Sequence, residues 1–69
     1  MLGNFVIVSV HGELLSLCDD GYYFDKPSLF TVFYDDLRIC DKLVKDINNC
    51  GIICKSMTYD KYKSIFKEW

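Results

Sequence analysis

The sequence predicts a small α+β domain in which one antiparallel-type sheet of three to four strands carries two helices. Three observations support this class: apolar β-branched runs early in the chain, an amphipathic repeat that follows an Asp pair, and a second such repeat at the C-terminus. The expected order is β-β-(β)-β-α-β-α, with both helices against one sheet face. The 69 residues form a single domain, residues 1–69.

The first two strands are expected to form a tight hairpin. Residues 5–10 read FVIVSV and residues 13–17 read ELLSL, which leaves His11 and Gly12 as a two-residue turn. Strand alternation assigns Val6, Val8, Leu15 and Leu17 to the core face, whereas Phe5, Ile7 and Leu14 point to the other side. This other face is also apolar, so we expect something to cover it.

The segment between residues 18 and 34 alternates turn and strand signals. Residues 18–21, CDDG, predict a turn because Asp and Gly favour the required backbone angles. Residues 22–24 either continue as a short strand or form a loop. Pro27 interrupts the chain, and residues 29–34, LFTVFY, predict a clear strand.

Two helices complete the predicted fold. Asp35 or Asp36 can cap the first helix, and Gly51 is expected to end it in the left-handed conformation. Residues 52–57 read as another strand, and Thr58 can cap a last helix over residues 59–69. The helical spacing selects the inward side chains of the first helix, namely Leu37, Cys40, Leu43, Val44 and Ile47. In the last helix the same spacing selects Tyr62, Ile65, Phe66 and Trp69, a stripe that docks on its own sheet or across a homodimer.

Composition and charge exclude several classes of function. The net charge of −2 excludes a strongly basic nucleic-acid binder and a heavily acidic DNA mimic. There is a single histidine, His11, in a predicted turn, and no glycine pattern for a nucleotide, so we expect no catalytic residue, no enzyme activity and no cofactor. No signal peptide or membrane span is recognisable, which predicts a cytoplasmic protein, in the host cytosol, that does not contact the membrane.

The four cysteines are expected to be reduced thiols. A cytosolic chain keeps its thiols free, and a buried free cysteine packs as a small apolar residue. Cys50 and Cys54 form one loose pair, whereas a structural zinc site shows two tight ligand pairs. We therefore expect no metal site.

Acidic and aromatic residues gather between positions 19 and 25. Asp19, Asp20 and Asp25 surround Tyr22 and Tyr23, without the ligand spacing of a calcium loop. These acids are either solvated turn residues or the rim of a docking surface, and the aromatic residues either pack in the core or face a partner. The docking interpretation makes these five residues the candidate partner-binding site.

Charge is unevenly distributed along the chain. Residues 1–36 carry six carboxylates against one lysine, whereas residues 37–69 carry seven basic groups against four acids. An alternative function is therefore a small nucleic-acid or nucleotide regulator, although a single arginine makes nucleic-acid readout the weaker interpretation. Its phosphate-binding face would comprise Lys55, Lys61, Lys63 and Lys67.

The chain resembles the small accessory proteins of bacteriophages. The resemblance rests on FVIVSVHGELL, LFTVFYDD, the following helix and GIICKSMTYDKY, together with a composition typical of an AT-rich genome: no Ala, no Gln and few Arg and Pro. It implies a single α+β domain that binds and blocks a host enzyme or defence factor, with a host protein as its partner. It transfers no individual functional residue.

Overall fold

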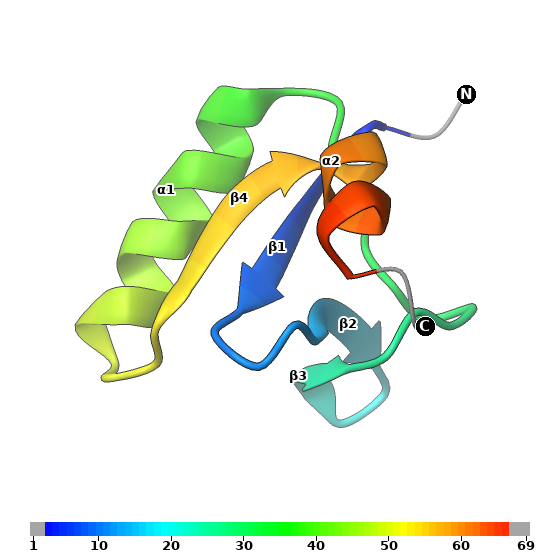
Figure 1. The fold of residues 1–69 in the computed structure, drawn as a ribbon. Helices are drawn as coiled ribbons and strands as arrows, with labels where there is room; N and C mark the ends of the chain where they lie inside the picture. Colours follow the sequence, from blue (N-terminus) through cyan, green and yellow to red (C-terminus); the bar gives the residue numbers. More distant parts are fainter. Residues whose placement is uncertain (1–2, 67–69) are drawn as a thin grey trace.

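The computed structural model describes residues 3–66 and contains one antiparallel sheet and two helices (Figure 1). Along the chain the order is β-β-β-α-β-α, so the predicted α+β class is confirmed. The strands lie in the order β3-β2-β1-β4. Their bounds are β1 (Phe5–Ser9), β2 (Leu14–Cys18), β3 (Gly21–Asp25) and β4 (Cys54–Thr58), and the helices are α1 (Leu37–Asn49) and α2 (Tyr59–Ile65).

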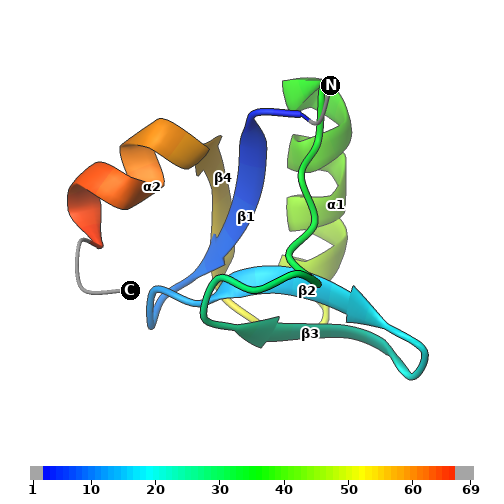
Figure 2. The ribbon, with the colours of Figure 1, turned by 90° about the vertical axis from the view of Figure 1, so that its right-hand side faces the viewer.

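The two helices cover opposite faces of β1 and β4 (Figure 2). Val6 and Val8 pack with Tyr62 of α2, whereas Ile7, between them, packs with Cys40 of α1. The expectation that both helices share one face is therefore wrong. Because β1 is apolar on both sides, each of its faces must pack against another element. The α1 helix covers the Ile7 face, for which the sequence analysis identified no covering element. The two-faced apolar pattern is thus accounted for within one chain.

The turn between β1 and β2 is longer than the predicted two-residue turn. Val8 lies opposite Leu14 rather than Leu15, and the Ser9 N–H donates to the Glu13 carbonyl at 2.8 Å. The Ser9 hydroxyl accepts from the Glu13 N–H at 3.2 Å and so supports the wider loop. A shift of one residue reverses the faces of β2. Leu14 consequently joins the α2 side and Leu15 the α1 side.

Residues 29–34 do not form the regular strand that their composition predicts. The Phe30 carbonyl accepts from Leu17 of β2 at 3.0 Å, whereas Tyr34 exchanges two hydrogen bonds with Phe5 of β1, at 3.0 and 2.9 Å. The segment therefore changes partner midway, so no continuous ladder forms. It lies where the β2–β3 hairpin runs crosswise to β1 (Figure 2). Residues 22–24, left open by the sequence, belong to strand β3.

The helix boundaries follow the predicted capping residues. The Asp36 carboxylate accepts from the Arg38 N–H at 2.9 Å, and Gly51 has the expected positive φ of 95°. The Thr58 hydroxyl accepts from the Lys61 N–H at 3.2 Å and begins α2. That helix ends at Ile65, earlier than the predicted residue 69.

Tyr62 holds α2 against the sheet. Its side chain is 1% exposed, and its hydroxyl donates to the Gly12 carbonyl at 2.9 Å. Phe66 packs against the apolar cluster that contains Tyr62. Ile65, which belongs to the same predicted stripe, is half-exposed. The prediction for Trp69 lies outside the described residues.

Removing the Tyr62 hydroxyl should weaken this attachment. We expect Tyr62→Phe to lower the free energy of unfolding by about 1–3 kcal/mol, because the buried Gly12 carbonyl loses its partner. Tyr59→Phe is the matched control, since no hydroxyl hydrogen bond of Tyr59 is found within residues 3–66, and its change should stay within about 0.5 kcal/mol. Urea unfolding followed by circular dichroism measures both. Equal effects would contradict the assigned hydrogen bond.

Candidate functional site

The β2–β3 hairpin extends from the core into solvent. Leu15 pairs with Phe24, and both belong to the cluster under α1. Two residues further along the same face, Leu17 pairs with Tyr22. These side chains lie beyond the helix and are 45% and 57% exposed. One end of the hairpin is therefore packed in the core and the other end is exposed to solvent. The exposed end carries apolar side chains on this face.

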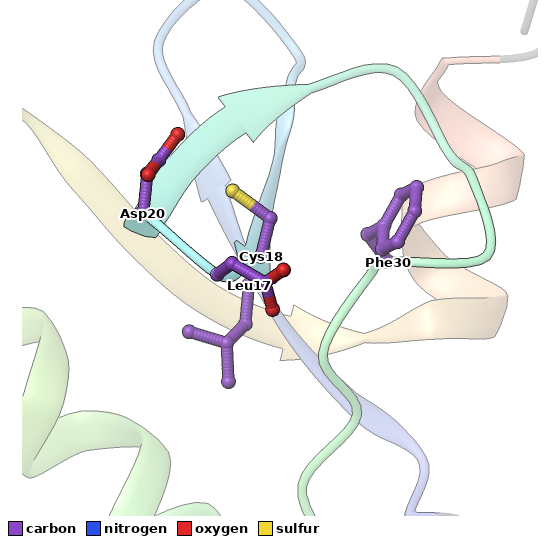
Figure 3. A pocket seen from close by; sticks show the side chains of 5 residues that line it. Leu17, Cys18, Asp20 and Phe30 are labelled. Carbon is purple, nitrogen blue, oxygen red and sulfur yellow. The ribbon is translucent and has the colours of Figure 1, made fainter.

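An open hollow lies beside the turn of this hairpin (Figure 3). Asp20 and Phe30 lie on opposite sides of it, with Cys18 between them (Figure 3). Phe30 is 56% exposed, and its carbonyl binds the Leu17 N–H, which fixes residues 29–31 next to β2. We call Leu17, Tyr22, Phe30, Asp19 and Asp20 together the hairpin surface.

The structure divides the predicted partner-binding residues into two groups. Asp19, Asp20 and Tyr22 are exposed on the hairpin surface. Tyr23, as the next residue in the strand, points to the opposite face and is half-buried. Asp25 lies at the far end of β3, where its carboxylate accepts from the Lys26 N–H at 2.8 Å.

Two members of the hairpin surface were missed by sequence reasoning. Leu17 was predicted to face the core together with Leu15, and it does share a face with Leu15, but it lies beyond α1 and is exposed. Phe30 was assigned to a regular strand, although Pro27 and Ser28 just before it signal a turn. In the structure Leu29 and Phe30 are turn residues, with the Phe30 N–H donating to the Ser28 hydroxyl at 3.1 Å.

Tyr22 lies near Tyr34, a half-buried residue of the cluster under α1. The Tyr34 hydroxyl is buried and has no hydrogen-bond partner within the described part of the chain. Burial, with a smaller contribution from Tyr22, raises the pKa of Tyr34 to about 12. Burial first, then the nearby Asp41 and Cys54, raises the pKa of Cys40 to about 11. Both groups are neutral at ordinary pH, and both resist ionisation in the folded state.

These raised pKa values predict a loss of stability at alkaline pH. The Cys40 thiol ionises in the unfolded chain near its ordinary pKa of 9.0 but in the folded chain only near 11. The unfolded state therefore releases the proton first, so stability is full below pH 9 and falls as the pH rises to 11. We expect a decrease of roughly 1–2 kcal/mol over this range from Cys40. Tyr34 acts in the same direction at higher pH.

The variant Cys40→Ala separates this effect from general alkaline unfolding. The variant is less stable at neutral pH, because a buried side chain is truncated, but its free energy of unfolding should change less between pH 9 and 11. Urea unfolding at several pH values measures how the free energy of unfolding of the wild-type protein and of the variant changes with pH. Parallel declines in the wild-type and variant proteins would contradict the assignment.

The lysines of the alternative phosphate-binding face lie on β4 and α2. Lys55 and Lys61 are exposed. Lys63 is engaged locally: its amino group lies 3.8 Å from the Asp60 carboxylate and 5.1 Å from the centre of the Tyr59 ring. Lys67 lies outside the described residues.

The remaining candidate groups are dispersed. Cys40 and Cys54 are buried, Cys50 is exposed and all four cysteines are free. His11 is exposed in the loop between β1 and β2. Within residues 3–66 no three His, Cys, Asp or Glu side chains gather in a way that could hold a metal ion. Neither described helix has the length and apolar character needed to cross a membrane.

Comparisons with known proteins add no assignment to this geometry. No protein-family model, no curated protein and no solved structure matches the chain.

Proposed function

We propose that this chain is a non-enzymatic binding protein that docks on another protein through the hairpin surface and blocks or modulates it. The observation that carries the proposal is the exposure of three large apolar side chains near one acidic turn: Leu17 and Tyr22 pair across the hairpin, and Phe30 lines the hollow together with Leu17, Asp19 and Asp20. Single exposed apolar residues are ordinary on protein surfaces. Here the three come from adjacent backbone segments and border one acidic turn, an arrangement typical of interfaces.

The expected partner is a host protein. The resemblance to phage accessory proteins supports a bacterial enzyme or defence factor, met in the host cytosol. Neither Asp19 nor Asp20 has a basic side chain within 4 Å among the described residues. Their charge is thus available to attract a basic surface and to speed its encounter with the hairpin. Inhibition would then follow from steric cover of the partner's working surface.

Affinity capture with matched variants tests this function. The tagged chain is incubated with bacterial lysate, with and without nuclease, and the captured proteins are identified by mass spectrometry. We expect one enriched host protein that persists after nuclease treatment. Tyr22→Ser and Phe30→Ser should each reduce its capture by about tenfold or more, because truncating a central apolar contact costs upwards of 1–2 kcal/mol.

The control variant is Ile53→Ser, which removes an apolar side chain that is 72% exposed and lies just before β4. Its capture should equal that of the wild-type protein. Thermal unfolding of all variants confirms that each remains folded. Enrichment that disappears with nuclease would instead support nucleic-acid binding. Equal losses from Ile53→Ser and Tyr22→Ser would remove the hairpin surface from the interaction.

A further inference from the structure

We propose that the outer edge of β3 accepts an extended segment of the partner as a fifth strand, with lysine or arginine of that segment against Asp19 and Asp20. The inference rests on the proposed function and specifies how the partner lies on the hairpin surface. Three features of the described residues support it: an unpaired backbone edge, a rigidly attached strand and an asymmetric charge distribution.

The backbone of β3 is open on one side. Leu17 donates its N–H to Phe30, and the Leu15 carbonyl accepts from Val32, so these two residues of β2 direct their backbone groups away from β3. Their partners in the register, Tyr22 and Phe24, therefore direct N–H and C=O to the outside of the sheet. No backbone or side-chain partner for these groups is found within residues 3–66. Figure 2 shows β3 as the outermost strand, on the side of β2 away from β1.

Between Gly21 and Phe24 this edge lacks the usual protection against pairing, and the one charged residue of the strand, Asp25, lies at its end. Edge strands are commonly blocked by an inward charge, a lysine, a bulge or a proline within the strand. Residues 21–25 read GYYFD, and Pro27 follows only after the strand has ended. Phe24 packs into the cluster under α1 and so anchors the strand. A partner segment would therefore meet a strand that is already ordered, which lowers the entropic cost of pairing.

Charge identifies the kind of segment that fits. Asp19 and Asp20 lie at the beginning of β3 and Asp25 at its end, where Lys26 offsets one charge. The turn end is therefore the more acidic, and a basic residue of the partner belongs there.

Selection of peptides on the full-length chain tests the inference. A displayed library of random peptides is panned against the immobilised protein, and the enriched sequences are synthesised. We expect alternating β-branched or aromatic residues with at least one lysine or arginine. Amide hydrogen exchange followed by NMR then locates the bound peptide. At saturation the Tyr22 and Phe24 amides should exchange at least tenfold more slowly, whereas the Ile53 amide, remote from the hairpin, should not change.

A charge variant provides an independent measure. We expect Asp20→Asn to weaken the peptide several-fold at low salt and less at high salt. The matched control is Asp46→Asn, which neutralises an exposed acid on α1 and should leave affinity unchanged. Equal effects of the two variants would contradict recognition at the turn.

The outcomes separate this inference from the proposed function. Binding of a peptide or captured partner that requires Tyr22 and Phe30 supports docking. If that binding leaves the exchange of the Tyr22 and Phe24 amides unchanged, strand addition is overturned and docking stands. Enrichment of acidic peptides, or of none, would overturn the inference, as would protection of both amides by self-association without peptide. Failure of the docking function itself would appear in the lysate, as capture unaffected by Tyr22→Ser and Phe30→Ser.

Discussion

Replacing Ile7 with alanine is expected to lower the free energy of unfolding by about 3 kcal/mol. Ile7, on β1, is completely buried in the cluster under α1. Truncation of such a side chain loses both its transfer free energy and its packing contacts. A chain of 69 residues has a total stability of roughly 3–10 kcal/mol. The variant should therefore lose roughly a third of this stability at the upper end of the range and all of it at the lower end. Thermal and urea unfolding measure the effect.

Ile39→Ala provides the control on α1, the helix that covers Ile7. Ile39 lies on α1 but is exposed, so its truncation should change stability by no more than about 0.5 kcal/mol. The pair tests the correction that the structure makes to the sequence expectation, in which Ile7 faced away from the core. A small loss for Ile7→Ala, equal to that of Ile39→Ala, would mean that α1 does not cover this face of the sheet.

Replacing Gly12 with alanine is expected to cost about 2–3 kcal/mol. Gly12 has a φ of +84°, where an added Cβ is strained, and that Cβ would lie 2.8 Å from the Phe66 ring. The same residue supplies the carbonyl that binds Tyr62. The loop between β1 and β2 must therefore approach α2 closely, and any side chain at Gly12 pushes the helix away.

Gly51→Ala separates backbone strain from this contact. Gly51 has a similar φ of +95°, but an added Cβ would meet nothing within 4 Å. We expect it to cost about 1 kcal/mol, the strain alone. The difference between the two variants measures the steric conflict with Phe66. A difference near zero would show that α2 adjusts freely, and would contradict close packing between this helix and the loop.

The local features of the fold could be predicted from the sequence because local chemistry determines them. Asp36 and Thr58 cap helices through bonds to residues two and three positions away, and Gly51 supplies its own backbone angle. The turn at Asp19 and Asp20 likewise depends on adjacent residues. Such short-range determinants are visible in the sequence without knowledge of the fold.

The errors arose where tertiary contacts decide between local alternatives. The Ser9 hydroxyl binds the loop backbone and shifts Leu14 and Leu15 by one position, which a two-residue turn rule does not anticipate. Residues 29–34 have strand composition, yet their hydrogen bonds are divided between β2 and β1. Both helices were assigned to one face, because strand alternation shows that two faces are apolar but not which helix reaches each.

The candidate site was only partly visible for the same reason. The acids and Tyr22 could be found as a charged cluster with an aromatic neighbour. Leu17 and Phe30 complete the hairpin surface only because Leu17 lies beyond α1 and its N–H binds the Phe30 carbonyl. The opposite orientation of Tyr22 and Tyr23 follows from strand alternation once residues 21–25 are known to be a strand.

Site-specific photocrosslinking in bacterial cells tests whether the hairpin surface binds another protein. The photoreactive residue p-benzoylphenylalanine replaces Tyr22 in one variant and Ile53 in another, and irradiated products are identified by mass spectrometry. If the hairpin surface binds a partner, we expect a crosslink from position 22 to one other protein and none to that protein from position 53. Crosslinking of the same protein from both positions, or from position 53 alone, would contradict this expectation.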